Sequence, residues 1–174
     1  MKKKIIKEKM VLSLIVCFLV VLAIALLKDI ISLEINKRRT GISFKESIDL
    51  TELPVITLYN DGQKLNFLLD TGSNISHFNS KAEELLKRYD EVHKTGFDIA
   101  TATGVTEGSN RWVGIPLQYK KQSFIEDFML LDLQEAFDSV KKENGVQLHG
   151  ILGNSFFIKY RYVLDFEDLV AYTK

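Results

Sequence analysis

The sequence predicts a mostly β domain with two or three short helices, preceded by one transmembrane helix. Two observations predict this class. An unbroken apolar run fills residues 10–27, and from residue 53 onward short segments rich in β-branched and aromatic residues alternate with turn signals. The chain has 174 residues, which is enough for one domain and an appendage but not for two full domains.

Composition excludes several functional classes. The formal net charge is zero, and the C-terminal part holds no run of Lys or Arg, so the charge pattern does not indicate nucleic-acid binding. A single cysteine, Cys17, excludes an internal disulfide and a thiolate zinc site. His77, His93 and His149 are scattered without a His-x-x-x-His pair. We therefore expect neither a metal nor another cofactor.

The N-terminal apolar run predicts a membrane anchor. Its eighteen residues carry no formal charge and span about 27 Å as a helix, close to the hydrocarbon thickness of a bilayer. Five of the first nine residues are lysines, which keeps this end in the cytoplasm. The expected division is a basic cytoplasmic tail (1–9), a transmembrane signal-anchor helix (10–27), a juxtamembrane linker (28–49) and an extracytoplasmic folded domain (50–174).

A cleaved signal peptide is the alternative for this segment. Ala23-Ile24-Ala25 has the A-x-A form of a cleavage site. However, Leu26 and Leu27 continue the apolar run past it, and the run is long for a signal peptide. The pattern favours the anchor, and both interpretations place the domain outside the cytoplasm.

The domain begins with a predicted hairpin. Residues 53–59 are rich in β-branched and aromatic side chains, and Asp61-Gly62 is a turn signal. The return strand at 64–69 alternates, with Leu65, Phe67 and Leu69 on one face. This hairpin leads the chain to Asp70.

Further elements follow from the same rules. A capping box at 80–83 predicts a helix over 81–92, and another helix starts near 132 and stops at Asn144-Gly145. Residues 104–108 are predicted as a hairpin tip, and Asn154 as the cap of a short helix reaching 159. The remaining strands are expected at 97–103, 111–117, 123–131, 146–152, 162–166 and 169–172.

The stretch from Leu68 to Ser73 is the strongest chemical signal. Two apolar residues bring a strand into the core, and Asp70 then stands at its end before Thr71, Gly72 and Ser73. Gly72 has no Cβ, so a backbone N–H can approach the carboxylate closely. Thr71 and Ser73 add short hydroxyl groups within local reach.

These residues resemble the signature of the retropepsin-like aspartic proteases, in which an apolar pair precedes Asp-Thr-Gly-Ser. A second family element, an apolar pair and glycine before a short helix, is matched by Ile151, Leu152 and Gly153. Thr103, Gly104 and Val105 lie where the family carries a flexible β-hairpin flap, an assignment by position only. The resemblance covers roughly residues 53–172 and implies a closed β-barrel.

The resemblance also implies an activity. One Asp-Thr-Gly per chain implies a homodimer in which each subunit contributes Asp70, and the paired carboxylates share a proton and activate a water for peptide-bond hydrolysis. Thr71 would brace the two active-site loops, Gly72 would help to bind substrate, and the flap would close over an extended peptide. The expected partners are thus a peptide or protein substrate, a second copy of the chain and, through the N-terminal helix, a membrane.

Two other interpretations remain open. An Asp at the end of a strand commonly does no more than hydrogen-bond its own turn. A chain with this fold could also be a non-catalytic peptide-binding or dimerisation module.

Overall fold

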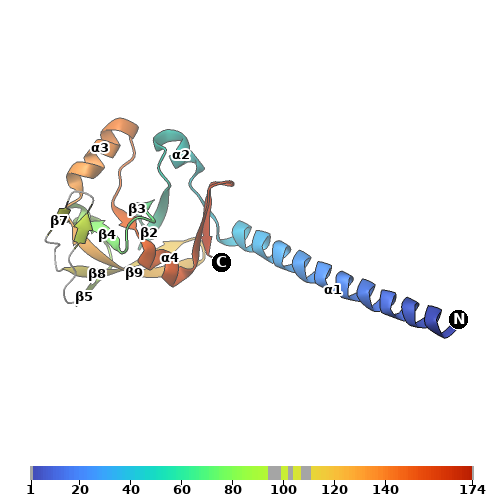
Figure 1. The fold of residues 1–174 in the computed structure, drawn as a ribbon. Helices are drawn as coiled ribbons and strands as arrows, with labels where there is room; N and C mark the ends of the chain where they lie inside the picture. Colours follow the sequence, from blue (N-terminus) through green and yellow to red (C-terminus); the bar gives the residue numbers. More distant parts are fainter. Residues whose placement is uncertain (1, 94–98, 102–103, 107–110, 174) are drawn as a thin grey trace.

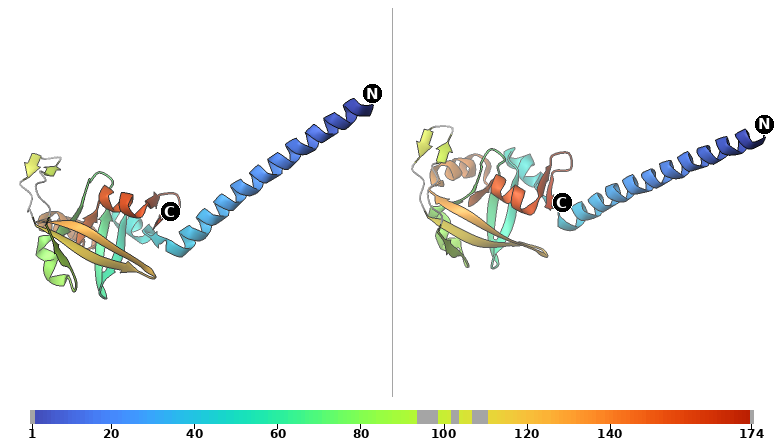
Figure 2. Two further views of the ribbon diagram at one scale, coloured as in Figure 1. Left: turned by 90° about the horizontal axis from the view of Figure 1, so that it is seen from below. Right: turned by 60° about the horizontal axis from the view of Figure 1, so that its bottom comes forward.

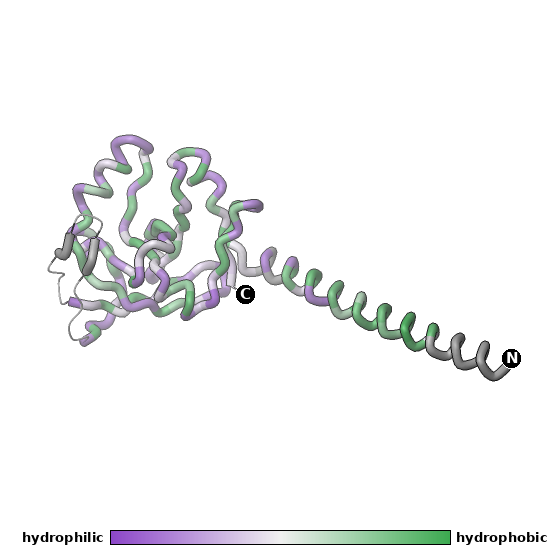
Figure 3. Tube along the Cα trace, viewed as in Figure 1, coloured by the Kyte–Doolittle hydropathy of each residue, from purple (hydrophilic) through white to green (hydrophobic). Residues whose placement is uncertain are grey.

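The computed structural model describes residues 2–93, 99–101, 104–106 and 111–173, and it divides into a long N-terminal helix and a β domain (Figure 1). Helix α1 (Lys2–Thr40) projects away from the domain. Apolar residues fill its middle (Figure 3), and its segment Leu12–Ile35 is long and apolar enough to cross a membrane. A signal sequence has the same properties, so the helix alone does not separate the two interpretations of this segment.

The domain is a closed six-stranded barrel, which confirms the predicted fold class. Its strands are β2 (Val55–Asn60), β3 (Gln63–Leu69), β4 (Ser76–Asn79), β8 (Trp112–Tyr119), β9 (Gln122–Leu131) and β10 (Gly150–Leu152). Their order is β2-β3-β10-β4-β9-β8, and pairing of Tyr59 with Gln118 closes the ring. β5 (Asp90–Val92) extends the sheet beyond β8, antiparallel to it.

Aromatic side chains fill the barrel. Phe67, Phe78 and Phe128 from three strands are fully buried, with ring centroids 5.6–6.3 Å apart. The predicted alternation of β3 is confirmed, because Leu65, Phe67 and Leu69 all point into this core. Burial of these rings supplies much of the hydrophobic stabilisation of the domain.

A smaller sheet and three helices surround the barrel. The sheet has the order β1-β12-β11, from β1 (Ile42–Ser43), β12 (Val170–Thr173) and β11 (Tyr162–Asp165). The helices are α2 (Lys45–Thr51), α3 (Gln134–Asn144) and α4 (Asn154–Tyr160). α3 ends at Gly145, which has a left-handed backbone (φ 74°), as the sequence predicts. β6 (Ile99–Thr101) and β7 (Gly104–Thr106) form a separate hairpin.

The predicted helix at 81–92 is wrong. A short 3₁₀ helix covers Ser80–Leu85 instead, and the chain then extends into β5. The side chain of Asn60 explains the early stop. Its carbonyl oxygen accepts hydrogen bonds from the backbone N–H groups of Lys87 (2.7 Å) and Arg88 (3.0 Å), which a continuing helix would need for its own ladder.

The predicted linker at 28–49 also needs correction. α1 continues to Thr40, and the folded domain begins at Ile42 rather than at residue 50. Ile42 pairs with Ala171 of β12, and Ile42 and Phe44 are buried in the main core. Two apolar residues in a short charged segment are too few to show a period, so their burial was not predicted from the sequence.

Two strands also differ from expectation. β4 was not predicted, because three of its four buried residues are polar and the segment shows no apolar alternation. The strand expected over 146–152 is shortened to β10, because Leu148 packs into a second small core with Val55 and Phe137.

Candidate active site

Asp70 lies where β3 ends and the chain turns toward β4. Its backbone N–H donates to the carbonyl oxygen of Leu152 (3.0 Å) in β10, which runs parallel to β3. Its carboxylate oxygen Oδ1 accepts a hydrogen bond from the N–H of Gly72 (2.8 Å). A Cβ at position 72 would lie 3.1 Å from that oxygen, so glycine allows the close approach. The turn therefore fixes the direction of the carboxylate.

The surroundings of Asp70 leave it available for chemistry. Asp70 is half-buried, whereas Thr71 and Gly72 are exposed. Among the residues that the structure describes, no Lys or Arg pairs with Asp70. Ser73 is half-buried and donates its hydroxyl to the carbonyl oxygen of Ile75 (2.7 Å), which tightens the turn. The carboxylate is thus oriented but not neutralised by a cation.

The structure places the second motif directly beside this turn. Ile151 and Leu152 of β10 pair with Leu68 and Leu69 of β3. Gly153 then packs against the turn so closely that a Cβ would lie 2.7 Å from the carbonyl carbon of Ile75 and closer still to its oxygen. The two motifs, about 80 residues apart in sequence, therefore form one structural unit.

The first turn of α4 holds the loop that follows Asp70. Asn154 donates from its backbone to the carbonyl of Ser73 (2.8 Å) and from its side-chain amide to the carbonyl of Thr71 (3.0 Å). Ser155 donates its N–H to the carbonyl of Asn74 (3.1 Å). Three carbonyls of the loop are thus fixed by two residues of α4, which restricts movement of the Asp70 turn.

A buried carboxylate, Glu126 of β9, binds two serines that follow the two motifs and was not predicted as a site residue. Its side chain is 2 % exposed, and Oε1 accepts hydrogen bonds from the hydroxyls of Ser76 (2.9 Å) and Ser155 (2.8 Å). Ser76 in turn accepts from the N–H of Gly153 (3.2 Å). Nζ of Lys159 lies 3.7 Å from Oε2. Glu126 therefore ties β4, the second motif and α4 together.

A sequence signal for Glu126 exists. In β9 the alternating inward positions are Phe124, Glu126 and Phe128, and all three are buried. An acidic residue on the apolar face of a strand requires a buried partner, because an unpaired charge there costs several kcal/mol. The serines that satisfy it come from distant segments, so the pattern alone does not identify them.

His77 is a buried titratable group on which the charge of Asp70 acts. It lies in β4, pairs with Ile151 of β10, and is 6 % exposed. Burial lowers the pKa of His77 below its usual range, and the negative charge of Asp70 opposes this shift in part. Its Nδ1 atom is buried without a hydrogen-bond partner in the described part of the chain. Burial therefore disfavours the protonated form of this imidazole, which lies in the strand that follows the Asp70 turn.

The flap assignment is only partly described. Gly104 and Val105 lie in β7, and pairing of Thr101 with Gly104 makes β6 and β7 a hairpin. The predicted tip at 104–108 therefore begins as a strand, whereas Thr103 lies outside the described residues. Figure 2 shows this hairpin at the end of the domain opposite to α1.

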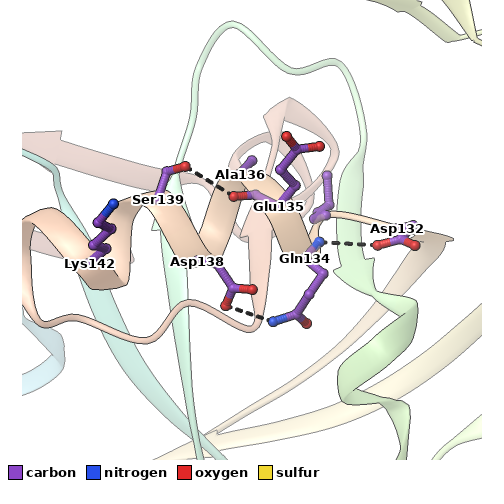
Figure 4. Close-up of a pocket in the computed structure, with 8 residues that line it drawn as sticks. Asp132, Gln134, Glu135, Ala136, Asp138, Ser139 and Lys142 are labelled. Atoms are coloured by element: carbon purple, nitrogen blue, oxygen red, sulfur yellow. Dashed lines mark hydrogen bonds between the residues drawn. The ribbon is translucent and has the colours of Figure 1, made fainter.

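A hollow along α3 is separate from Asp70. Two of its polar side chains bond to neighbours on α3 (Figure 4): Gln134 donates to Asp138 (2.8 Å), and Ser139 to the carbonyl of Glu135 (3.2 Å). Gln134 also accepts a hydrogen bond from Asn79 of β4 (2.9 Å). No group of three or more metal-ligating His, Cys, Asp or Glu side chains occurs among the residues described.

Comparison with known proteins gives similarity of fold only. No protein-family profile matches this chain, and no curated protein is similar to it in sequence. Among solved structures, EIAV protease complexed with the inhibitor HBY-793 is 19 % identical, with a TM-score of 0.46, over 64 % of this chain and 90 % of that one. The retroviral protease-like domain of Ddi1 from Leishmania major is 11 % identical, with a TM-score of 0.43, over 70 % and 92 %.

A retropepsin-like aspartic protease from Rickettsia conorii is 15 % identical, with a TM-score of 0.41, over 76 % of this chain and 86 % of that one. The closed barrel with its two adjacent motifs is the arrangement that the sequence resemblance predicts.

Proposed function

We propose that this chain is a membrane-anchored aspartic endopeptidase that acts as a homodimer, with Asp70 of each subunit at a shared active site. The observation that carries the proposal is the Asp70 turn itself. The carboxylate is oriented by Gly72 at 2.8 Å, has no cation beside it in the described residues, and stands on a loop braced by Asn154 and Ser155. A catalytic group must be held in one orientation by the residues around it. A turn with no catalytic role does not require such bracing.

The chemistry follows from bringing two such carboxylates together. Two carboxyl groups held close cannot both ionise easily, so the pair shares one proton. The ionised Asp70 takes a proton from a water whose oxygen attacks the peptide carbonyl carbon, while the protonated Asp70 donates to the carbonyl oxygen. The C–N bond then breaks: one hydroxyl of the tetrahedral intermediate returns its proton to the pair, and the leaving amine takes a proton from the pair, so that one shared proton remains. Water is the co-reactant, and no cofactor is needed.

The remaining parts have proposed roles. Thr71 and Gly72 are exposed beside Asp70, which suits a brace between subunits and contact with substrate. The β6–β7 hairpin would cover an extended peptide that adds itself as a strand. α1 would anchor the chain with its N-terminus in the cytoplasm and the domain outside, and the bilayer would raise the effective concentration of subunits for pairing.

The test is cleavage of a mixed peptide library by the full chain in detergent micelles, from acidic to neutral pH. Asp70→Asn and Asp70→Ala should abolish cleavage. Asp61→Asn is the matched control, because Asp61 lies in an exposed turn with φ 46° that asparagine also adopts readily. Cleavage that survives in the Asp70 variants would refute the proposed site.

The oligomeric state of each sample is measured alongside, because a monomer cannot assemble two Asp70 residues. A folded dimer that binds peptides without cleaving them would favour the alternative, a non-catalytic peptide-binding or dimerisation module on the same fold.

A further inference from the structure

The helix that carries the apolar span enters the domain without a break. The span ends at Ile35, and α1 continues for five residues to Thr40 before β1 begins at Ile42. Five helical residues rise about 7.5 Å, which is close to the thickness of one headgroup layer. If the span crosses a bilayer, the domain therefore begins at the lipid surface rather than at the end of a loose linker.

An ion pair locks the end of α1 to the domain. Nζ of Lys37 lies 2.7 Å from a carboxylate oxygen of Asp165 and also contacts the carboxylate of Asp168, so it bridges both ends of the β11–β12 turn. The side chain of Lys37 is only 15 % exposed. These contacts raise the pKa of Lys37, while Asp165 has a lowered pKa because Lys37 bonds to it.

Close backbone packing reinforces this junction. The carbonyl of Thr40 accepts a hydrogen bond from the side chain of Gln122 (2.8 Å) in β9. Gly41 lies so close to β12 that a Cβ there would be 2.7 Å from a methyl group of Val170. The chain then pairs at once with Ala171 through Ile42. The helix has contacts to three segments of the domain within six residues, so its direction relative to the barrel is fixed.

The β11–β12 turn also carries an apolar side chain suited to a lipid interface. Phe166 lies between Asp165 and Asp168 and is 58 % exposed, and its ring makes an edge-type contact with Phe44 (ring centroids 5.5 Å). An exposed apolar ring beside a span can be buried at the boundary between headgroups and acyl chains, which removes apolar area from water. The β6–β7 hairpin lies at the opposite end of the domain, where it can open without meeting lipid (Figures 1 and 2).

We propose that Lys37, Gly41 and the β11–β12 turn form a rigid mount that holds the domain against the bilayer surface, so that its substrates are membrane-bound polypeptides cut close to the bilayer. The substrate class rests on the endopeptidase activity proposed above, but the mount does not. A flexible tether would let the domain move through a wide range of distances from the bilayer surface. A fixed junction instead holds the active site at one distance from that surface.

Spin-label distances test the mount without any catalysis. Cys17→Ser removes the single cysteine, and Ser32→Cys on α1 with Gln118→Cys on β8 provides two exposed labelling sites. Labelled chain is diluted with excess unlabelled Cys17→Ser chain in lipid nanodiscs, so that few homodimers carry labels on both subunits. The distance between the two labels of one full chain should then have one narrow distribution. Lys37→Ala should broaden it, whereas Lys45→Ala should not, because Lys45 pairs only with Asp49 within α2. A broad distribution before any change at Lys37, or no response to Lys37→Ala, overturns the mount.

Cleavage at different heights tests the substrate class. Two membrane-anchored reporters carry the same peptide, chosen from the library peptides that the full chain cuts. A helical spacer holds the peptide above the membrane, and it has roughly 10 residues (about 15 Å) in the near reporter and roughly 40 residues (about 60 Å) in the far reporter. In vesicles, we expect the full chain to cut the near reporter at least about tenfold faster. A flexible Gly/Ser insertion of about 30 residues between Ile35 and Asn36 keeps every contact of Lys37 and should reduce this ratio several-fold.

The outcomes separate the two proposals. Equal cutting of both reporters by the full chain overturns the substrate class while leaving the endopeptidase in place. Failure to cut any soluble library peptide, in a folded dimer, removes the endopeptidase and the substrate class together. In that case the spin-label distances still decide whether the mount exists.

Discussion

Gly153 offers a sharp test of how the two motifs are joined. In Gly153→Ala the new Cβ would lie 2.7 Å from the carbonyl carbon of Ile75 and 2.8 Å from the carbonyl oxygen of Ser73, against an ordinary contact of 3.4 Å or more. All these neighbours are backbone atoms, so the loop itself must move by at least 0.7 Å (3.4 − 2.7). Overpacking of this kind costs about 1–3 kcal/mol.

The movement should also break hydrogen bonds. The N–H groups of Asn154 and Ser155 bind the carbonyls of Ser73 and Asn74, and losing both adds about 1 kcal/mol each. We therefore expect Gly153→Ala to lower the free energy of unfolding by about 3–5 kcal/mol and to abolish cleavage, because the Asp70 turn moves with the loop.

Urea denaturation of residues 36–174 measures this cost, because that piece keeps the whole core and the contacts of Lys37. Gly62→Ala is the matched control. A Cβ at position 62 meets no atom within 4 Å, so only the strained backbone (φ +84°) contributes, about 1 kcal/mol. If Gly153→Ala costs no more than Gly62→Ala, the close packing of the two motifs is refuted.

Two further predictions concern buried polar groups around the site. Glu126→Ala removes both hydrogen bonds to the serines and should lower the free energy of unfolding by about 3 kcal/mol or more. Glu126→Gln keeps an acceptor and should lower it by about 1 kcal/mol. Equal losses for the two variants in urea denaturation would contradict the bracing role. His77 has a folded-state pKa below its ordinary 6.5, so the unfolded chain binds a proton that the folded chain does not, and stability should be present above pH 6.5 and lost as the pH falls below it. His77→Gln should weaken the pH dependence of stability in melting curves recorded at several pH values, and an unchanged pH dependence would argue against this role of His77. Some pH dependence should remain in the variant, because burial also lowers the pKa of His149.

Local signals predicted much of the fold. The alternation of β3, the stop of α3 at Gly145 and the short helix after Gly153 all depend on residues close in sequence, and the structure confirms them. The predicted cap of that helix is wrong, because Gly153 holds the cap position and the side chain of Asn154 donates to Thr71 instead. The helix expected over 81–92 failed because its donors bind Asn60, which lies more than 20 residues earlier. Propensity describes what a segment favours alone, and a distant side chain that captures its N–H groups overrides that preference.

The candidate site likewise contains some residues that the sequence predicted and others that only the structure identified. The sequence predicted Asp70, its turn and the Ile151-Leu152-Gly153 element as candidates, and the structure places them side by side. Their catalytic role remains a prediction. Glu126 could have been suspected as an acidic residue on an apolar strand face, but its serine partners could not.

By itself, the sequence determined the N-terminal apolar helix, the mostly β class and the local shape of the Asp70 turn, because each is set by neighbouring residues. Only the tertiary structure decided that the supposed linker is docked through Lys37, and that Glu126 bonds to two serines beside the motifs. The physical reason is that buried charges and backbone donors must find partners, and barrel closure selects which distant segments supply them.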